Sequence, residues 1–187
     1  MDRRGPRCRP GRLSARGDPR AHTGLRRRPA MPLARMICAS QTKFPVGQAN
    51  DKTIFRAIHD ESARHYAERQ ITGAPLFDWD NFLQILEGDR ARLTDAFLFM
   101  ARDPRQQRIV LLDFSRIDER EFSRWQMLLR DDSPETAALL LRYSPTAHWK
   151  PEAMPPTAAL KFAQALVQAR ESQAEPPLRA AHAAHAA

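Results

Sequence analysis

A glutamine inside an apolar segment is the residue of this sequence whose type and position point most directly to chemistry. Gln84 lies in the run 82–86, which reads FLQIL. Side chains alternate along a strand, so Phe82, Gln84 and Leu86 are expected to share one face. A glutamine amide carries both donors and an acceptor, and burying them without partners is costly. We therefore expect a polar ligand or a polar neighbour to meet the Gln84 amide.

The residues around Gln84 predict a β-hairpin. The segment 71–88 reads ITGAPLFDWDNFLQILEG, with bulky strand-forming residues before Asp80-Asn81 and an apolar run after it. Two apolar runs joined by a two-residue polar turn are typical of a hairpin. The predicted tip is Asp80-Asn81, and Gln84 lies in the returning strand.

Motifs for catalysis or metal binding are missing from the sequence. It has no Gly-rich phosphate loop, no Ser-His-Asp arrangement and no paired-carboxylate motif. Asp80, Glu87 and Asp89 are explained as turn and cap residues. Cys8 and Cys38 are the only cysteines and fit neither a disulfide framework nor a metal site. We predict that the protein is not an enzyme, which disfavours, for example, an acylphosphatase-like activity on a ferredoxin-like fold.

Several ordered motifs resemble the BLUF domain, the flavin-based blue-light sensor of bacteria. They are ITG at 71–73, FLQILEG at 82–88, DPR at 103–105 and FSRWQM at 122–127. The resemblance covers roughly residues 33–130. It implies an FAD held between two helices on a ferredoxin-like sheet. It also implies a light response in which hydrogen bonds rearrange among a tyrosine, a glutamine and the flavin.

The same resemblance implies which residues contact the cofactor. Gln84 matches the switching glutamine of the family, and Trp125 and Met127 match its semi-mobile tryptophan and methionine. Arg105 matches a position near the ribityl-phosphate side of the flavin. Ser40 matches the serine of the Tyr-x-Ser motif on the first strand.

The sequence departs from the family pattern at positions that matter for the flavin. Cys38 replaces the tyrosine of Tyr-x-Ser, and a buried cysteine behaves as a small hydrophobe without the redox potential or reach of a phenol. Tyr66, preceded by His65, replaces an asparagine whose two-sided amide a hydroxyl does not imitate. Gln106 replaces a histidine. Either the flavin lies differently here, or Tyr66 and its neighbours fill the cleft. We expect FAD binding to be weak or absent and the photocycle to be weakened or lost.

Hydrophobic periodicity predicts an α+β, ferredoxin-like sandwich in the order strand-helix-strand-strand-helix-strand-strand. The predicted strands cover 33–40, 76–79, 82–86, 108–115 and 122–129, and the predicted helices cover 51–69 and 89–101. Right-handed crossovers place both helices on one face of the sheet. The strand 108–115 is predicted to be buried. Short helices over 134–142 and 156–170 follow, and an apolar stripe predicts that the second packs onto the domain.

The positive charge of the chain is confined to its N-terminal segment. The 187 residues carry a net charge of +8, and residues 1–30 hold ten arginines and two aspartates. The remaining 157 residues therefore hold 30 − 10 = 20 basic and 22 − 2 = 20 acidic side chains. We predict a disordered Arg/Pro-rich leader (1–30), a BLUF-like domain (31–132), a helical extension (133–173) and a disordered tail (174–187). The leader is a nucleic-acid-binding arm, an inert segment, or sequence upstream of a true start at Met31.

These observations predict a bacterial sensory protein that signals through protein contacts. No apolar run approaches the ~20 residues needed to cross a bilayer, and the sparse cysteines fit a reducing compartment, so we expect a cytoplasmic location. We expect an unknown downstream protein as partner, a homo-oligomeric state, and nucleic-acid binding only through the leader. The alternative is a flavin-free, degenerate BLUF domain that serves as an interaction or oligomerisation module.

Overall fold

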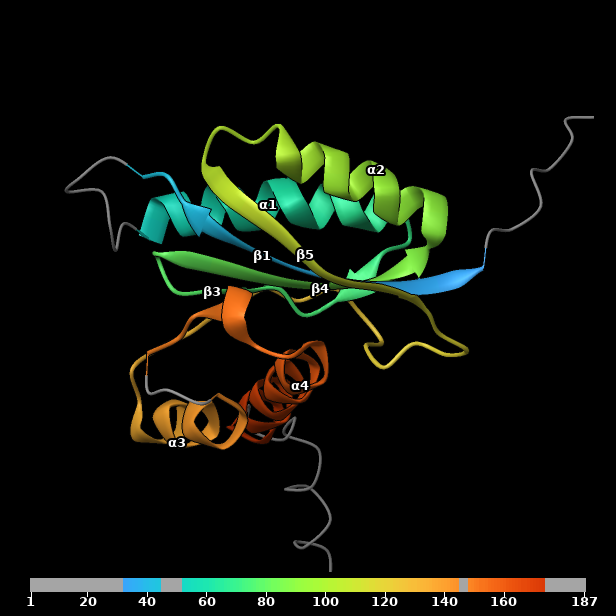
Figure 1. The fold of residues 1–187 in the computed structure, drawn as a ribbon. Coiled ribbons are helices and arrows are strands. Elements are labelled where there is room, and N and C mark those ends of the chain that lie inside the picture. Colours follow the sequence, from blue (N-terminus) through green and yellow to red (C-terminus); the bar gives the residue numbers. More distant parts are fainter. Residues whose placement is uncertain (1–31, 45–51, 145–147, 174–187) are drawn as a thin grey trace, which may run out of the picture.

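The computed structural model describes residues 32–44, 52–144 and 148–173. One β-sheet forms its middle layer, with helices α1 and α2 on one face and α3 and α4 on the other (Figure 1). The predicted leader, the C-terminal tail and the predicted helix cap at Asp51 lie outside the described residues.

The order of elements confirms the predicted strand-helix-strand-strand-helix-strand-strand pattern. The elements are β1 (Leu33–Thr42), α1 (Lys52–Glu68), β2 (Thr72–Gly73), β3 (Leu76–Phe77), β4 (Asn81–Asp89), α2 (Arg90–Ala101), β5 (Gln106–Arg116), β6 (Leu128–Leu129), α3 (Pro134–Tyr143), the 3₁₀ turn η1 (Pro151–Ala153) and α4 (Pro156–Gln173). The cap of α2 is the predicted one, because the Asp89 carboxylate accepts hydrogen bonds from the backbone N–H groups of Ala91 and Arg92.

The strand order places β1 and β4 at the centre of the sheet. It runs β5-β1-β4-β3-β6, and β2 also pairs with β4. β1 and β4 are antiparallel, and their register puts Cys38 directly opposite Gln84. Opposite residues in an antiparallel pair point to the same face, so these two side chains are neighbours. Seven residues of each of these strands are buried, whereas the other strands are shorter or lie at an edge.

The hairpin at β3–β4 is present, but its tip differs from the predicted one. Phe77 pairs with Phe82, and Asn81 already belongs to β4. The Asp78 carboxylate accepts hydrogen bonds from the N–H groups of Asp80 and Asn81 at 3.2 and 2.7 Å. Such side-chain-to-backbone bonds build a turn of their own. The predicted Asp80-Asn81 tip is therefore wrong, because the turn begins at Asp78.

The outgoing strand of the hairpin is split where Ala74 and Pro75 interrupt it. Proline has no N–H group to donate to a ladder, so β2 and β3 are separate short strands. Gly73 has φ +145°, and a Cβ atom placed there would lie 2.0 Å from the Ile85 carbonyl oxygen. Only glycine fits this close approach of two backbones.

The predicted last strand over 122–129 is largely wrong. Regular strand geometry is confined to Leu128–Leu129, with one isolated bridge between Trp125 and Gly73. The chain still follows β3 in a parallel direction, because Leu128 donates to the Pro75 carbonyl. A long regular strand does not form beside a partner that is itself split. The predicted alternation of faces is confirmed: Phe122 packs with α4, and Trp125 and Met127 pack on the α1 side.

β5 is not the buried strand that its composition predicts. Although it contains Ile109, Val110, Leu111 and Leu112, none of its residues is buried. β5 pairs only with β1 among the described strands, and edge strands are covered less than central ones. Two register irregularities, between Ile37 and Cys38 and between Ala39 and Gln41 of β1, also interrupt this pairing.

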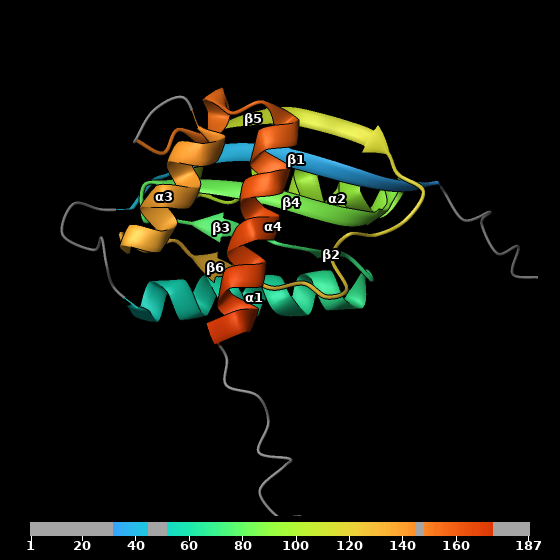
Figure 2. The same cartoon turned by 90° about the horizontal axis from the view of Figure 1, so that it is seen from below.

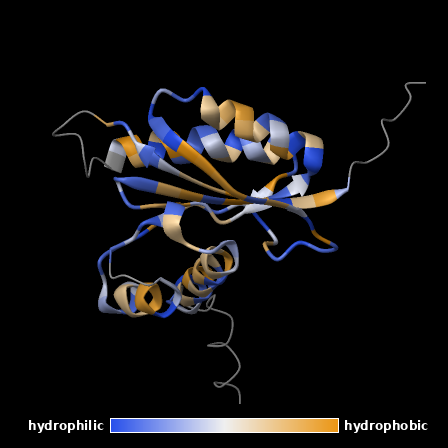
Figure 3. Ribbon diagram, in the orientation of Figure 1, coloured by the Kyte–Doolittle hydropathy of each residue, from blue (hydrophilic) through white to orange (hydrophobic). Residues whose placement is uncertain are grey.

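The C-terminal helices share a core with the sheet. Figure 2, viewed from below, shows α3 and α4 lying across the face opposite α1 and α2. Ala163 and Leu166 of α4 are buried, and Leu160 and Val167 pack beside them, as the apolar stripe predicts. They contact a cluster that includes Ile37, Leu83 and Ile85 of the sheet. The hydrophobic residues along the central strands in Figure 3 therefore have helices on both sides.

A buried ionic network fixes the segment that leads to β6. Glu87 is fully buried and forms an ion pair with Arg35 at 2.7 Å. Its other oxygen accepts hydrogen bonds from the backbone N–H groups of Glu121 and Phe122. Arg120 donates to the Thr72 hydroxyl and the Gln70 carbonyl. Because a buried carboxylate needs such partners, this network holds the start of the segment that carries Trp125 and Met127.

Candidate functional site

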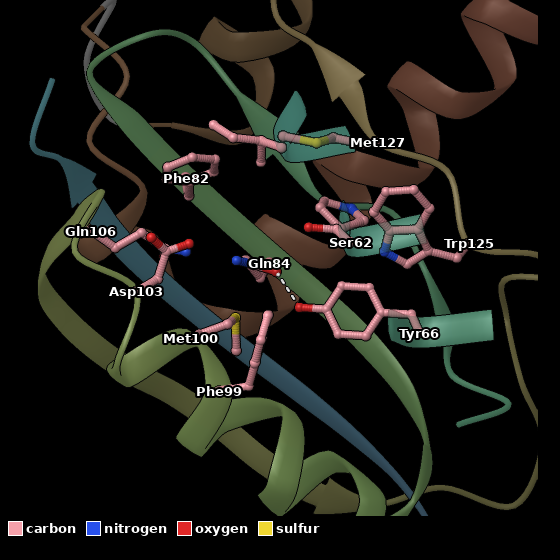
Figure 4. Close-up of a pocket in the computed structure, with 12 residues that line it drawn as sticks. Ser62, Tyr66, Phe82, Gln84, Phe99, Met100, Asp103, Gln106, Trp125 and Met127 are labelled. Carbon is pink, nitrogen blue, oxygen red and sulfur yellow. Dashed lines mark hydrogen bonds between the residues drawn. The ribbon is translucent and has the colours of Figure 1, made fainter. Parts of the chain in front are cut away.

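Gln84 lies on β4 at the centre of the face covered by α1 and α2. Its side chain is 6% exposed and points between the two helices (Figure 4). The apolar residues Phe82 and Leu86 flank it on the same face. The prediction that Gln84 is buried among apolar neighbours is confirmed.

A narrow cleft surrounds Gln84. Its volume is about 350 Å³ including open solvent, but the centre of a water-sized sphere fits in only about 20 Å³ of it. That is room for about one water molecule. The lining residues come from α1, α2, β4 and the segments beside them: Ile58, Ser62, Tyr66, Pro75, Phe82, Gln84, Phe99, Met100, Asp103, Gln106, Trp125 and Met127.

Tyr66 provides the polar neighbour that Gln84 needs. It lies on α1, is 2% exposed, and its hydroxyl donates a hydrogen bond to Gln84 Oε1 at 3.4 Å (Figure 4). This distance is long for an O–H···O bond, so the bond is a weak one. Burial, together with the nearby Cys38 and Asp103, raises the pKa of the Tyr66 phenol above its usual range. The hydroxyl therefore keeps its proton and acts as a donor toward Gln84.

Cys38 lies beneath the cleft, on β1 beside Gln84. It packs in a cluster with Met36, Tyr66 and Leu86 and is almost fully buried. Burial raises the pKa of its thiol to about 12. Because a neutral buried thiol is a small hydrophobe, the position that carries tyrosine in the BLUF motif contributes packing here.

Trp125 and Met127 form the wall of the cleft opposite α2. The Trp125 ring lies 5.7 Å from the Tyr66 ring and 5.4 Å from the His59 ring. Its indole Nε1 is buried without a hydrogen-bond partner. Met127 packs with Ile58 in an apolar cluster. The unpaired indole N–H is a polar group that a movement of Trp125 or a ligand would satisfy.

Ser40 reaches the cleft through Gln106. The Ser40 hydroxyl donates to Gln106 Oε1 at 2.8 Å, and Gln106 lines the far end of the cleft beside Asp103. Burial of the Asp103 carboxyl favours its neutral form, but hydrogen bonds from Arg105 outweigh this, and its pKa lies below the usual range. Asp103 is therefore an anion at neutral pH.

Arg105 lies outside the cleft, where two carboxylates hold it. Its guanidinium contacts Asp103 at 2.8 Å and Glu61 at 2.7 Å. The hydrogen bond with Asp103 is the main reason why the pKa of Arg105 is raised. These residues line an open hollow of about 610 Å³ at the mouth between α1 and α2. The charge of Arg105 is therefore already balanced at the position that the resemblance places near the flavin phosphate side.

His65 also lies away from Gln84. Its ring stacks on Phe99 at 3.9 Å, and its Nε2 is buried without a hydrogen-bond partner. Burial is the main cause that lowers the pKa of His65, so the neutral ring is favoured. It supports the wall of the cleft from behind.

The structure thus brings Tyr66, Gln84, Trp125 and Met127 together and places the other predicted residues around them. Ser62, Phe99 and Asp103 line the cleft without having been predicted. The apolar stripe of α2 points to Met100, but a helical pattern alone does not show which residues reach past the core into a cleft. No group of three or more His, Cys, Asp or Glu side chains in the described ranges is arranged to hold a metal. None of the helices described is long and apolar enough to span a bilayer.

The family model for BLUF, sensors of blue-light using FAD, matches residues 33–128. This match covers more than half of the chain, and the chain belongs to the BLUF family. The family binds flavin, as its description states. No curated protein matches the sequence.

Solved structures of the family have the same fold. The structure titled BlsA photo-activated state aligns with TM-score 0.63 and 22% identity, over 72% of this chain and 94% of that chain. BlrP1 of Klebsiella pneumoniae, titled with FMN and cyclic diGMP, aligns with TM-score 0.51 and 24% identity, over 77% and 37%. A bacterial light-regulated adenylyl cyclase aligns with TM-score 0.50 and 19% identity, over 75% and 35%. The ferredoxin-like α+β fold is thereby confirmed.

The cleft does not fit a flavin as its side chains stand. The room left beside Gln84 is about that of one water molecule, far less than a three-ring flavin requires. Tyr66 and Trp125, whose rings lie 5.7 Å apart, occupy the space between the helices and the segment before β6. A flavin would reach Gln84 only if these rings moved.

Proposed function

We propose that this chain is a sensory module of the BLUF family that acts through protein contacts, binds FAD weakly and no longer responds to blue light. The observation that carries the proposal is the bond from the Tyr66 hydroxyl to Gln84 across a cleft with room for about one water molecule. Gln84, Trp125 and Met127 support a family-type cleft, because they gather at one place. When bound, the flavin would supply the light absorption.

Simple arithmetic supports weak rather than forbidden binding. Replacing the asparagine of the family by Tyr66 and its strand tyrosine by Cys38 removes polar contacts to the flavin and its switch. Two lost hydrogen bonds of about 1.4 kcal/mol each lower the affinity roughly a hundredfold. The ordered rings of Tyr66 and Trp125 must also be displaced, which adds to this loss.

The light response is expected to be affected more than binding. Cys38 keeps its proton because of its raised pKa and lies within an apolar cluster, so the strand offers no phenol to the cleft. The Tyr66 phenol is on the opposite wall, and its hydroxyl is already engaged by Gln84. The chain therefore lacks the strand tyrosine that the family pattern requires.

A second candidate is a flavin-free interaction module, and Arg105 favours it. This arginine is paired with Asp103 and Glu61, so a flavin phosphate would have to compete with two carboxylates. Melting curves with increasing FAD separate the two candidates. Weak binding raises the melting temperature at high FAD, because a ligand that binds only the folded state stabilises it. A flavin-free module shows no change.

Self-association through β5 is part of the proposal. Val110 and Leu111 are 41% and 46% exposed on this edge strand. A second copy laid antiparallel along β5 would bring Arg108 of one strand toward Asp113 of the other, with the two apolar residues midway between them. The two register irregularities shorten the straight edge, so the contact is small and the dimer weak. Any further partner, and the cytoplasmic location, are also proposals.

A double substitution tests the assignment of the two replaced positions. Cys38→Tyr combined with Tyr66→Asn restores the family residues on both walls of the cleft. We expect this variant to purify with more flavin than the unmodified protein and to regain part of a reversible red shift under blue light. If it folds, as its circular dichroism would show, yet binds no more FAD, these two positions do not explain the weak binding.

A further inference from the structure

Tyr66 fills the part of the cleft that lies beside Gln84. Its ring is almost fully buried and lies 5.7 Å from the Trp125 ring and 5.3 Å from the His65 ring. Cys38 and Leu86 pack in the same cluster from the sheet side. In Figure 4 the ring extends from α1 toward Gln84, and its hydroxyl meets the amide. The ring and the hydroxyl therefore use the volume and the hydrogen-bond acceptor that a ligand would need.

From this arrangement we infer that Tyr66 is the residue that decides which ligands the cleft admits: as a tyrosine it excludes planar ring systems, and as a smaller residue it admits them. The inference rests on the same cleft as the proposed function. An apolar cavity opened by removing a large side chain accepts aromatic molecules, because close-packed surroundings do not collapse fully. The neighbours of Tyr66 are largely apolar, and Gln84 would remain to orient a polar ring edge.

The ring and the hydroxyl of Tyr66 make separable contributions. Tyr66→Phe removes the hydrogen bond to Gln84 and keeps the ring. Tyr66→Ala and Tyr66→Asn remove the ring, and the asparagine variant keeps a polar group. If exclusion is a matter of volume, only the loss of the ring opens the cleft. The chain offers a matched control in its other tyrosine, Tyr143, which lies on α3 and packs against the opposite face of the sheet.

Riboflavin is the best probe, because it carries the ring system without a phosphate. It leaves out the paired Arg105 at the mouth of the cleft. Affinity is measured by quenching of riboflavin fluorescence with the full chain, and melting temperature is recorded with and without the ligand. FAD is titrated in parallel.

We expect Tyr66→Ala and Tyr66→Asn to bind riboflavin at least about tenfold more tightly than the unmodified chain, a change of about 1.4 kcal/mol. Tyr66→Phe and Tyr143→Ala should stay within about twofold, a difference of under about 0.5 kcal/mol. In the two ring-deleted variants riboflavin should also raise the melting temperature. The asparagine variant provides the answer if the alanine variant does not fold.

Two results would overturn the inference. One is an equal gain in Tyr66→Phe and Tyr66→Ala, which would assign the exclusion to the hydrogen bond. The other is a folded Tyr66→Ala or Tyr66→Asn protein that gains no affinity. The proposed function fails separately, if the unmodified chain shows a light-driven spectral shift. A gain in the ring-deleted variants would stand beside that result.

Discussion

Cys38 and Tyr66 lie in one apolar cluster, and burial keeps both in their protonated forms. A thiol and a phenol are reactive mainly as anions, and both anions are disfavoured here. The polar chemistry of the cleft is therefore reduced to hydrogen bonding, with Tyr66 as donor and Gln84 as acceptor. At the scale of single residues, the site is closed and chemically quiet.

The unreactive thiol gives a direct prediction. In a Cys8→Ser background, native protein at about pH 8.5, the ordinary thiol pKa, should resist iodoacetamide, while urea-unfolded protein should react. The folded pKa of Cys38 is raised to about 12, so the thiol stabilises the fold below the ordinary value, and this stability is lost as pH rises toward 12. Cys38→Ala should lose less stability over that range in denaturant titrations. Rapid labelling of the native protein would contradict the burial described here.

Only part of this residue-scale description could be predicted from the sequence. The need of Gln84 for a polar partner follows from the FLQIL pattern, and the structure confirms its burial. That Tyr66 is the partner depends on how α1 lies over β4, which periodicity does not determine. The pairing of Arg105 with Glu61 likewise joins residues 44 positions apart.

At the scale of elements, the β2–β3 segment depends on one glycine. Gly73 ends β2 with φ +145°, and its N–H and carbonyl bond to residues on the path to β6. The segment with Trp125 therefore lies against the backbone of Gly73. A side chain at this position would disturb both β4 and the wall of the cleft.

We predict that Gly73→Ala lowers the unfolding free energy by about 3 kcal/mol or more, because of backbone strain and a clash with the Ile85 carbonyl. Gly88→Ala is the matched control. A Cβ there would meet Ile71 Cγ1 at 3.3 Å, a side-chain atom that can shift, so the change should stay within about 1 kcal/mol. Denaturant unfolding measures both. Equal effects in the two variants would contradict the close approach at Gly73.

Elements defined by local signals were predicted well, and elements defined by their neighbours were not. Asp89 caps α2 as predicted, because capping depends on residues adjacent in sequence. The burial of β5 was predicted wrongly, because an apolar strand has the same composition at the centre and at the edge of a sheet. The long last strand was predicted wrongly because its partner is split at Pro75.

At the scale of the whole molecule, helices cover both faces of the sheet, while the β5 edge stays open among the described strands. Exposed apolar residues on an edge strand are a template for pairing with another chain. Two copies related by a twofold axis satisfy this edge with one set of residues.

Sedimentation velocity tests this contact. We predict concentration-dependent dimers of the unmodified chain and a monomer for Leu111→Lys, since a buried unpaired charge opposes association. Leu141→Lys is the control, because Leu141 is 61% exposed on α3, away from β5. It should leave the dimer intact. A monomeric unmodified chain at all concentrations, or loss of the dimer only with Leu141→Lys, would refute pairing through β5.

The absorption spectrum of the purified full-length protein, before and after blue illumination and with added FAD, tests the central claim most directly. Because Tyr66 bonds to Gln84 in a cleft with room for about one water molecule, we predict a colourless protein. With excess FAD we predict weak binding and no reversible red shift of the flavin band. Protein that purifies with stoichiometric flavin and shows a reversible light-driven shift would contradict the account.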